Sequence, residues 1–246
     1  MEYRGYTQHI SRQFNDELEA IKNDLLEMGG MVERQIGMAA DGLLLRDSAL
    51  AEQAIDVDRS VNAMEISIDR QCGNIIARRQ PAASDLRLII SIARVTTDLE
   101  RIGDEASKVA KMAIKRAQES DTSATSRYFA QITEHVTGML RSALDAFARL
   151  DTREAIKVVL SDKTIDADYQ VALGDMKDQM RHNPHCIDAA LDYTWALRSL
   201  ERIGDHASNI AEQVIYLTEG IDVRHKSVDE LSQLLDSVRA SGAHAH

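Results

Sequence analysis

The 246-residue chain contains few of the residues that interrupt helices. It has only 2 prolines and 12 glycines, and both residue types disfavour the interior of a helix. Aromatic residues make up 4% of the sequence, so a core must be built from aliphatic side chains, methionine and alanine, as in bundles of long helices. These scarcities argue against an all-β fold or a disordered chain and favour a mostly helical protein.

Cysteine is equally scarce. Cys72 and Cys186 stand far apart, and neither has a second cysteine at metal-binding spacing. We therefore expect two small buried residues in a reducing compartment, and no disulfide or zinc site.

Long apolar runs and an excess of positive charge are also missing. The apolar stretch 86–95 is broken by Arg and Ser, and the first residues lack the apolar core of a signal peptide, so neither a transmembrane helix nor a secretory leader is expected. The net charge of −11 argues against binding to nucleic acid or anionic lipid and favours cations or basic partner surfaces. We expect a cytoplasmic protein without membrane insertion.

An internal repeat organises the chain. Residues 99–110 recur as residues 200–211, with nine of twelve positions identical at an offset of 101. Upstream, Asp58 and Asn62 correspond to Asp162 and Asp166 at an offset of 104. We therefore divide the chain into two related halves, 1–120 and 121–246, at the Ser/Thr-rich stretch 119–126.

Apolar residues within each half recur every three or four positions, which is the spacing of one helix face. The stripes cover residues 14–32, 57–75, 88–113, 132–150 and 193–217, with a further segment around 156–180. Breaks fall near residues 46–48, 80–84, 120–126, 150–152 and 181–185. This pattern predicts an all-α fold of two tandem, pseudo-symmetric three-helix bundles with six long helices. A short last helix is expected over Val228–Arg239.

Each copy of the repeat carries two acids four residues apart, which places them on one helix face: Glu100 with Asp104, and Glu201 with Asp205. Like charges at this spacing destabilise a helix by a few tenths of a kcal/mol, roughly. Gly103 and Gly204 each cost about 1 kcal/mol relative to alanine in a helix interior. The duplicated penalties suggest that a cation or a basic side chain neutralises the acids, with the glycine allowing its close approach.

A second helix in each half offers matching oxygen ligands. Asp58 and Asn62 are four residues apart, as are Asp162 and Asp166. Two antiparallel helices with such pairs could surround a hard cation such as Mg²⁺, Mn²⁺ or iron, in preference to zinc. Glu65 and Asp69 continue the first of these faces, but they align with Tyr169 and Leu173 and are weaker candidates.

A plain solvated face is the alternative interpretation of these acids, with Arg101 or Arg202 screening them. No phosphate-binding loop, nucleophile elbow or dinucleotide-binding glycine motif is present, and Gly103 and Gly204 stand where a ferritin-type Glu-x-x-His pair would need histidine. His206, which takes the place of Glu105 in the repeat, is expected at the surface. Met139 and Trp195 are interpreted as packing residues.

The two copies of Leu-Glu-Arg-Ile-Gly-Asp resemble the PhoU family of phosphate-signalling proteins. Residues 14–33 look like the first helix of that family, and residues 78–87 look like its connection between helices 2 and 3. The resemblance implies two three-helix bundles related by a pseudo-twofold axis. It also implies that metal ions are held by Glu100, Asp104, Glu201 and Asp205, with Asp58, Asp162 and Asp166 facing them. Asn62 departs from the strictly acidic pattern.

The resemblance further implies a regulator without enzymatic activity. Proteins of this family keep the phosphate-starvation (Pho) regulon off and restrain uptake when phosphate is plentiful. The implied partners are PstB, the ATPase subunit of the phosphate ABC transporter, and the sensor histidine kinase PhoR. We also expect a homo-oligomer, namely a dimer. Two alternatives from other classes stay open: a carboxylate-metal-dependent enzyme such as a hydrolase, and a metal-free helical scaffold.

Overall fold

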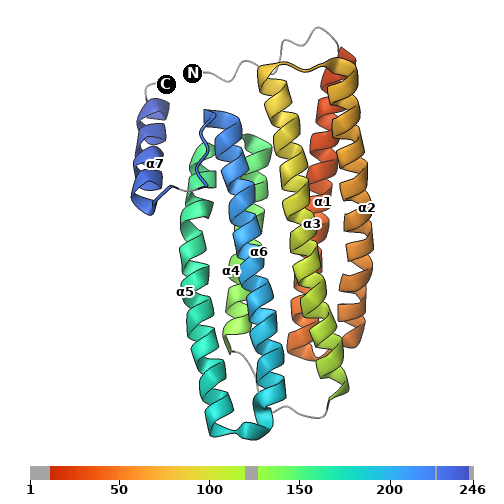
Figure 1. Ribbon diagram of the computed structural model, residues 1–246, viewed down its shortest axis with the longest axis vertical. Coiled ribbons are helices and arrows are strands. Elements are labelled where there is room, and N and C mark those ends of the chain that lie inside the picture. The colour runs from red at the N-terminus through yellow and green to blue at the C-terminus, as the bar shows by residue number, and fades with distance from the viewer. Residues whose placement is uncertain (1–11, 120–126, 225, 244–246) are drawn as a thin grey trace.

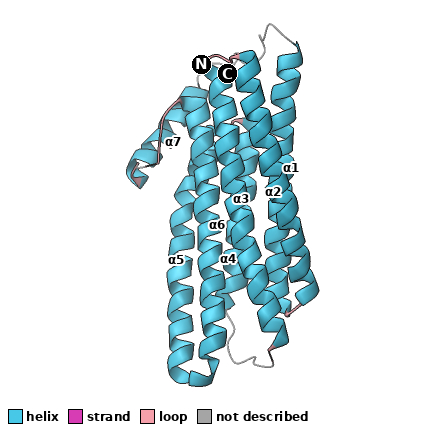
Figure 2. Ribbon diagram, turned by 45° about the vertical axis from the view of Figure 1, so that its right-hand side comes forward, coloured by secondary structure: helices cyan, strands magenta, loops and turns pink. Residues whose placement is uncertain are grey.

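The computed structural model describes residues 12–119, 127–224 and 226–243, and every regular element in these ranges is a helix (Figure 2). The order is α1 (Arg12–Leu45), α2 (Ser48–Arg79), α3 (Ala83–Gln118), α4 (Arg127–Arg149), α5 (Thr152–His182), a 3₁₀ turn η2 (Pro184–Cys186), α6 (Ile187–Glu219) and α7 (Val228–Ala243). The prediction of six long helices and a short last helix is confirmed, although α7 extends beyond Arg239. The division placed between residues 120 and 121 lies outside the described residues.

Local capping explains where several helices begin and end. Asp47 and Asp151 precede α2 and α5, and each carboxylate accepts hydrogen bonds from two backbone N–H groups of the first turn. Such caps satisfy amides that have no partner within the helix. Gly220 ends α6 at φ 72°, a left-handed conformation that glycine adopts without strain.

The six long helices form two bundles that pack side by side (Figure 1). Helices α1, α2 and α3 make the first bundle, and α4, α5 and α6 make the second. Helices α3 and α6 lie against each other at the seam, the contact between the two bundles, and they run antiparallel. Lys115 pairs with Asp192 near one end of the seam, and Arg94 contacts Gln213 near the other. Helix α1 also contacts α4, and among the described helices α7 contacts α5.

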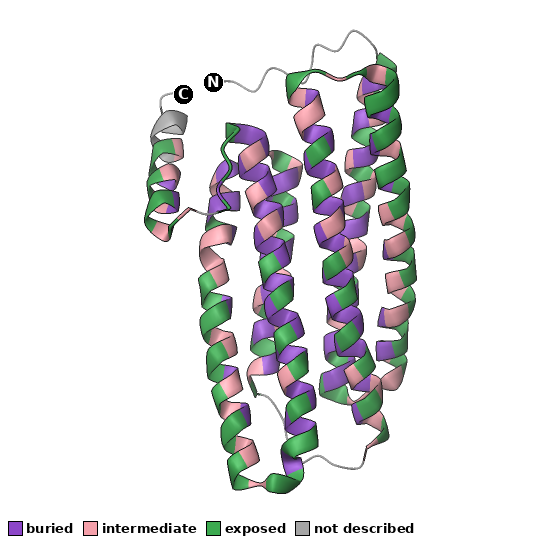
Figure 3. Cartoon of the chain, viewed as in Figure 1, coloured by how far each residue is buried: buried purple, intermediate pink, exposed green. Residues whose placement is uncertain are grey.

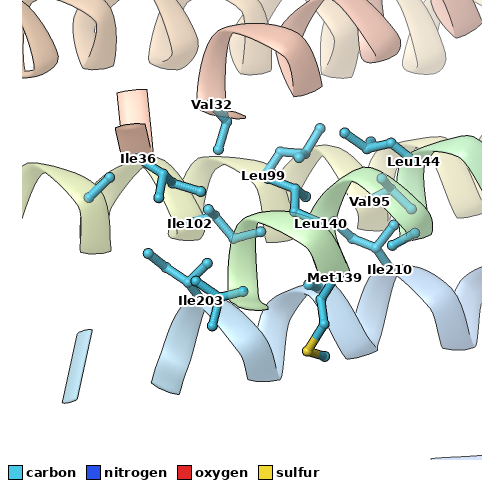
Figure 4. Close-up of a cluster of buried hydrophobic side chains, with 14 of the residues drawn as sticks. Val32, Ile36, Val95, Leu99, Ile102, Met139, Leu140, Leu144, Ile203 and Ile210 are labelled. Carbon is cyan, nitrogen blue, oxygen red and sulfur yellow. The ribbon is translucent and has the colours of Figure 1, made fainter. Parts of the chain in front are cut away.

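One apolar core serves both bundles. Figure 3 shows buried residues concentrated on α3 and α6 and exposed residues along the outer faces of α2 and α5. In Figure 4 one cluster combines side chains from four helices of the two bundles: Val32 and Ile36 of α1, Val95, Leu99 and Ile102 of α3, Met139, Leu140 and Leu144 of α4, and Ile203 and Ile210 of α6. Burying this apolar surface joins the two halves into one folding unit.

The structure confirms some single-residue expectations and overturns two. Met139 packs in the core, and Cys72 and Cys186 are buried free thiols. The packing interpretation of Trp195 is wrong, because its side chain is 64% exposed. The surface interpretation of His206 is also wrong: its ring is buried, and Nδ1 lies 2.9 Å from Oδ1 of Asp98 on α3. Both positions depend on where α3 meets α6, which helical periodicity does not reveal.

A search of the described helices for a span long and apolar enough to cross a membrane finds no candidate.

Candidate metal centre

Three carboxylates of the second bundle come together between α5 and α6. One oxygen each of Asp166, Glu201 and Asp205 lies within 4.8 Å of the corresponding oxygens of the other two. Asp162 lies one turn from Asp166 on α5, and its Oδ1 would be 3.8 Å from a Cβ atom placed on Gly204. Three of the four residues predicted for this half therefore lie close together, and Asp162 lies beside them.

The charges of this cluster oppose its own ionisation. Burial, together with the charges of Asp205 and Asp166, raises the pKa of Asp162 to about 6. Burial and the neighbouring Asp205 raise the pKa of Glu201, and burial and Asp166 raise the pKa of Asp205. A bound cation would reverse these shifts, because an opposite charge favours the ionised form.

The protein's own bases compensate this cluster only in part. Arg198 forms an ion pair with Oε1 of Glu201, but Oε2 is buried and has no hydrogen-bond partner among the described residues. Arg202, the expected screening residue, lies 2.7 Å from Oε1 of Glu105, and its charge also partly offsets the raised pKa of Asp205. A buried carboxylate oxygen without a partner is costly, and a cation would satisfy it.

The first bundle carries the related but unequal cluster between α2 and α3. Burial raises the pKa of Glu100, followed by the charges of Asp104, Glu65 and Asp58. Asn62 stands where the second bundle has Asp166, and its buried Oδ1 has no partner within the described part of the chain. The substitution removes one carboxylate, and among the described residues only the α5–α6 acids form a group of three within 4.8 Å.

Two further residues lie at the first cluster: Glu65, a weaker candidate from the sequence, and Gln35, which the sequence pattern had not singled out. Glu65 belongs to it, since burial and the charges of Asp69 and Asp104 raise its pKa. Gln35 of α1 is buried, and its Nε2 lies 3.1 Å from Oδ1 of Asp58 and 3.0 Å from the carbonyl oxygen of Gly103. Gln35 is a polar residue inside the apolar stripe of α1, and that irregularity was the signal that could have found it.

The two glycines of the repeat lie at equivalent positions where side chains of a neighbouring helix come close to the backbone. A Cβ atom on Gly103 would lie 3.4 Å from Oδ1 of Asp58 and 3.1 Å from Oε1 of Gln35. On Gly204 the atom would lie 3.4 Å from Ile165 and 3.8 Å from Oδ1 of Asp162. Glycine therefore lets the acids of α2 and α5 approach the backbone of α3 and α6, and the second bundle is the less crowded of the two.

The residues of the α5–α6 cluster fit a hard cation. The donors are all oxygen, which Mg²⁺, Mn²⁺ and Ca²⁺ prefer. One buried ligand oxygen, Oε2 of Glu201, has no hydrogen-bond partner in the described part of the chain, and Asp162 supplies a fourth carboxylate beside the three. The first cluster offers an amide oxygen and fewer closely placed carboxylates, so it fits less well.

Comparison with known proteins finds one domain family that matches two segments of the chain. A PhoU domain model matches residues 25–113 and 129–214. The chain is 50% identical over 233 residues to the Phosphate-specific transport system accessory protein PhoU homolog of Pseudomonas aeruginosa, covering 95% of this chain and 96% of that protein. It is 40% identical over 236 residues to the protein named PhoU of Escherichia coli K12, covering 96% and 97%.

Two solved structures share the architecture. The crystal structure of PhoU from Pseudomonas aeruginosa matches with a TM-score of 0.83 at 51% identity, covering 85% of this chain and all of that one. The phosphate transport system regulatory protein PhoU from Streptococcus pneumoniae matches with a TM-score of 0.80 at 29% identity, covering 86% and 99%. The two domain matches span most of the chain, and the similarity to these relatives runs through both bundles; this chain belongs to the PhoU family.

Proposed function

We propose that this protein is a cytoplasmic negative regulator of the phosphate-starvation regulon and of phosphate uptake. The observation that carries the proposal is similarity over both halves of the chain to proteins named as accessory to phosphate-specific transport. We propose that it works through contacts with PstB and PhoR and catalyses no reaction. Long helices with partly exposed faces are suited to such contacts.

We further propose that the acidic clusters hold metal ions. In the second bundle Asp166, Glu201 and Asp205 would bind the ion, with Asp162 beside them. In the first bundle Glu100, Asp104, Asp58 and Asn62 would take part, assisted by Glu65. A bound ion would neutralise the acids and tie α5 to α6, and α2 to α3. The metal would thus hold the two outer helices in place and set the shape of the surface offered to partners.

The regulatory proposal is tested by deleting the gene and growing cells in high phosphate. Alkaline phosphatase activity and phosphate uptake are then measured with and without the wild-type gene supplied in trans. We expect constitutive phosphatase activity or excessive uptake in the deletion strain and repression on complementation. Normal repression and normal uptake in the deletion strain would contradict the proposal.

A metal-free scaffold is the second candidate, and specific contacts favour it. The Arg198 guanidinium already pairs with Glu201, and the Gln35 amide donates to Asp58, so each cluster is partly compensated by the protein itself. In this case the double variant Asp166→Asn/Asp205→Asn would still complement the deletion strain. Failure of that variant to repress, at a wild-type protein level, would favour the metal-dependent regulator.

A further inference from the structure

An open pocket lies on the seam between the two bundles, where the second half of α3 runs beside the first half of α6 (Figure 1). Its volume is about 570 Å³. Met112 and Trp195 supply its apolar part, and Lys108, Lys111, Arg198 and Arg202 supply its basic part. Both bundles contribute, so the pocket exists only when they are packed together. We call it the seam groove.

An apolar stripe leads along α6 into the seam groove. Ile187, Leu191 and Trp195 follow one another at intervals of four residues, and all three are exposed. Trp195 is the only tryptophan of the chain. Residues four apart share one helix face, so the stripe offers a continuous apolar strip of the kind that receives a helix or an extended segment of a partner.

The seam groove is basic on an acidic protein. Four basic side chains line it against two acids, whereas the whole chain has a net charge of −11. Both acids and three of the four bases are engaged in ion pairs. Glu105 lies 2.9 Å from Lys108 and 2.7 Å from Arg202. Asp192 pairs with Lys115, and Arg198 pairs with Glu201. Lys111 makes no ion pair within the described residues. The groove therefore offers positive charge to an incoming group.

At the other end of the same seam, side chains of the protein itself cover the contact between α3 and α6. Arg94 stands where the repeat offset of 101 places Trp195 in the second half. The Arg94 guanidinium lies over the ring of Tyr216, 5.8 Å from its centroid, and reaches Gln213. His206 and Asn209 of α6 both bind Asp98 of α3 there. The chain covers that end with its own side chains, whereas Trp195 stays exposed at this end.

We propose that the seam groove binds an acidic amphipathic helical segment of a partner protein. Apolar side chains of that segment pack on Trp195 and Leu191, and its carboxylates lie at Lys111 and the neighbouring bases. A second copy of this chain fits less well, because a twofold contact through this face would set the same bases against each other. The inference rests on the proposed regulatory role only in that such a role needs a protein partner.

The test uses the full-length protein and the fluorescence of its single tryptophan. The probe is a designed helical peptide without tryptophan, with glutamate on one face and leucine and phenylalanine on the other. One matched peptide carries lysine at every glutamate position, and a second keeps the glutamates but carries serine at the apolar positions. We expect the first peptide to shift the Trp195 emission to shorter wavelength in a saturable manner, and the two others to bind at least about tenfold more weakly.

Variants locate the binding site. Lys111→Glu should weaken binding about fivefold, because it places an acid beside the peptide carboxylates. Lys177→Glu makes the same charge change at an exposed position of α5 outside the groove and should bind like the wild type. Trp195→Ala, measured by calorimetry, should weaken binding at least about tenfold, as expected for a central aromatic contact.

Three results would overturn the proposal. The first is no saturable change at peptide concentrations up to about 1 mM, beyond which binding is too weak to be specific. The second is equal weakening by Lys111→Glu and Lys177→Glu. The third is a Trp195 shift that follows protein concentration alone and disappears in Leu191→Ser, because this would make the face a contact between copies. The deletion-strain assay is independent, so the regulatory role and this groove can fail separately.

Discussion

Replacing Asp205 by asparagine should stabilise the protein without metal and remove its stabilisation by metal. The Asp205 carboxylate lies within 4.8 Å of both Asp166 and Glu201. Two unit charges about 5 Å apart repel by about 3 kcal/mol at an effective dielectric constant of 20. Asp166 and Asp205 are exposed and Arg198 pairs with Glu201, so solvent and this arginine reduce the total relief to about 1–2 kcal/mol.

Thermal unfolding in chelator and in excess Mn²⁺ or Mg²⁺ measures both effects. A change of 1 kcal/mol shifts the midpoint of a chain of this size by about 2–4 °C, so Asp205→Asn should melt roughly 2–8 °C higher in chelator. A metal at one hundred times its dissociation constant should stabilise the wild type by about 2.7 kcal/mol and the variant much less. The order of the two melting temperatures should therefore reverse when metal is added.

Asp41→Asn is the matched control, because Asp41 is exposed on α1, away from the cluster. It should leave both the chelator midpoint and the metal response unchanged. A lower melting temperature of Asp205→Asn than of the wild type in chelator would contradict this prediction, since the carboxylate would then make a net favourable contact. The prediction is also refuted if the variant and the wild type respond equally to metal.

Three further predictions concern positions around the clusters. Burial and the charge of Asp222 raise the pKa of Glu212 from 4.5 to about 7. Between these pH values the folded protein keeps a proton that the unfolded chain releases, so the free energy of unfolding falls as pH rises from about 4.5 to about 7. Glu212→Gln should reduce this fall by about 1 kcal/mol, after allowance for solvent screening, when the free energy is measured by urea unfolding. Gly204→Ala should stabilise the metal-free protein by about 0.5–1 kcal/mol through helix propensity, whereas Gly103→Ala should gain nothing, because its Cβ would lie 3.1 Å from Oε1 of Gln35; equal gains in thermal scans would contradict this difference. Gln35→Leu should cost about 1–3 kcal/mol in urea unfolding, since it removes the hydrogen-bond donor for Asp58 and Gly103, and a neutral effect would show that this donor adds no stability.

Periodicity and the internal repeat predict most of the fold. The apolar stripes give each long helix because burial of one helix face imposes a spacing of three and four residues. Asp47 and Asp151, whose carboxylates cap the first turns of α2 and α5, fall within two of the predicted breaks. The repeat gives the equivalence of Gly103 and Gly204, and with it the acids that lie opposite them. These features are local or are duplicated, so one sequence is enough to reveal them.

Contacts between helices that are distant in the chain could not be predicted from the sequence. Arg198 was missed as the partner of Glu201, and the ion pair that Arg202 makes across the seam with Glu105, besides its screening of Asp205, was also missed. Trp195 and His206 were placed wrongly for the same reason. The rotation of α6 about its own axis, relative to α3, decides which side chains meet. Helical periodicity does not fix this rotation closely enough to identify the contacting residues. Gln35 differs, since its polar character within an apolar stripe was visible.

The most direct test of the metal account is elemental analysis of the full chain, purified without a histidine tag or chelator. Inductively coupled plasma mass spectrometry counts Mg, Mn, Fe and Zn per chain in the wild type and in Asp166→Asn/Asp205→Asn. We expect close to stoichiometric Mg, Mn or Fe in the wild type and a clear loss in the double variant. Metal-free wild-type protein that also gains no thermal stability from these ions would contradict this expectation.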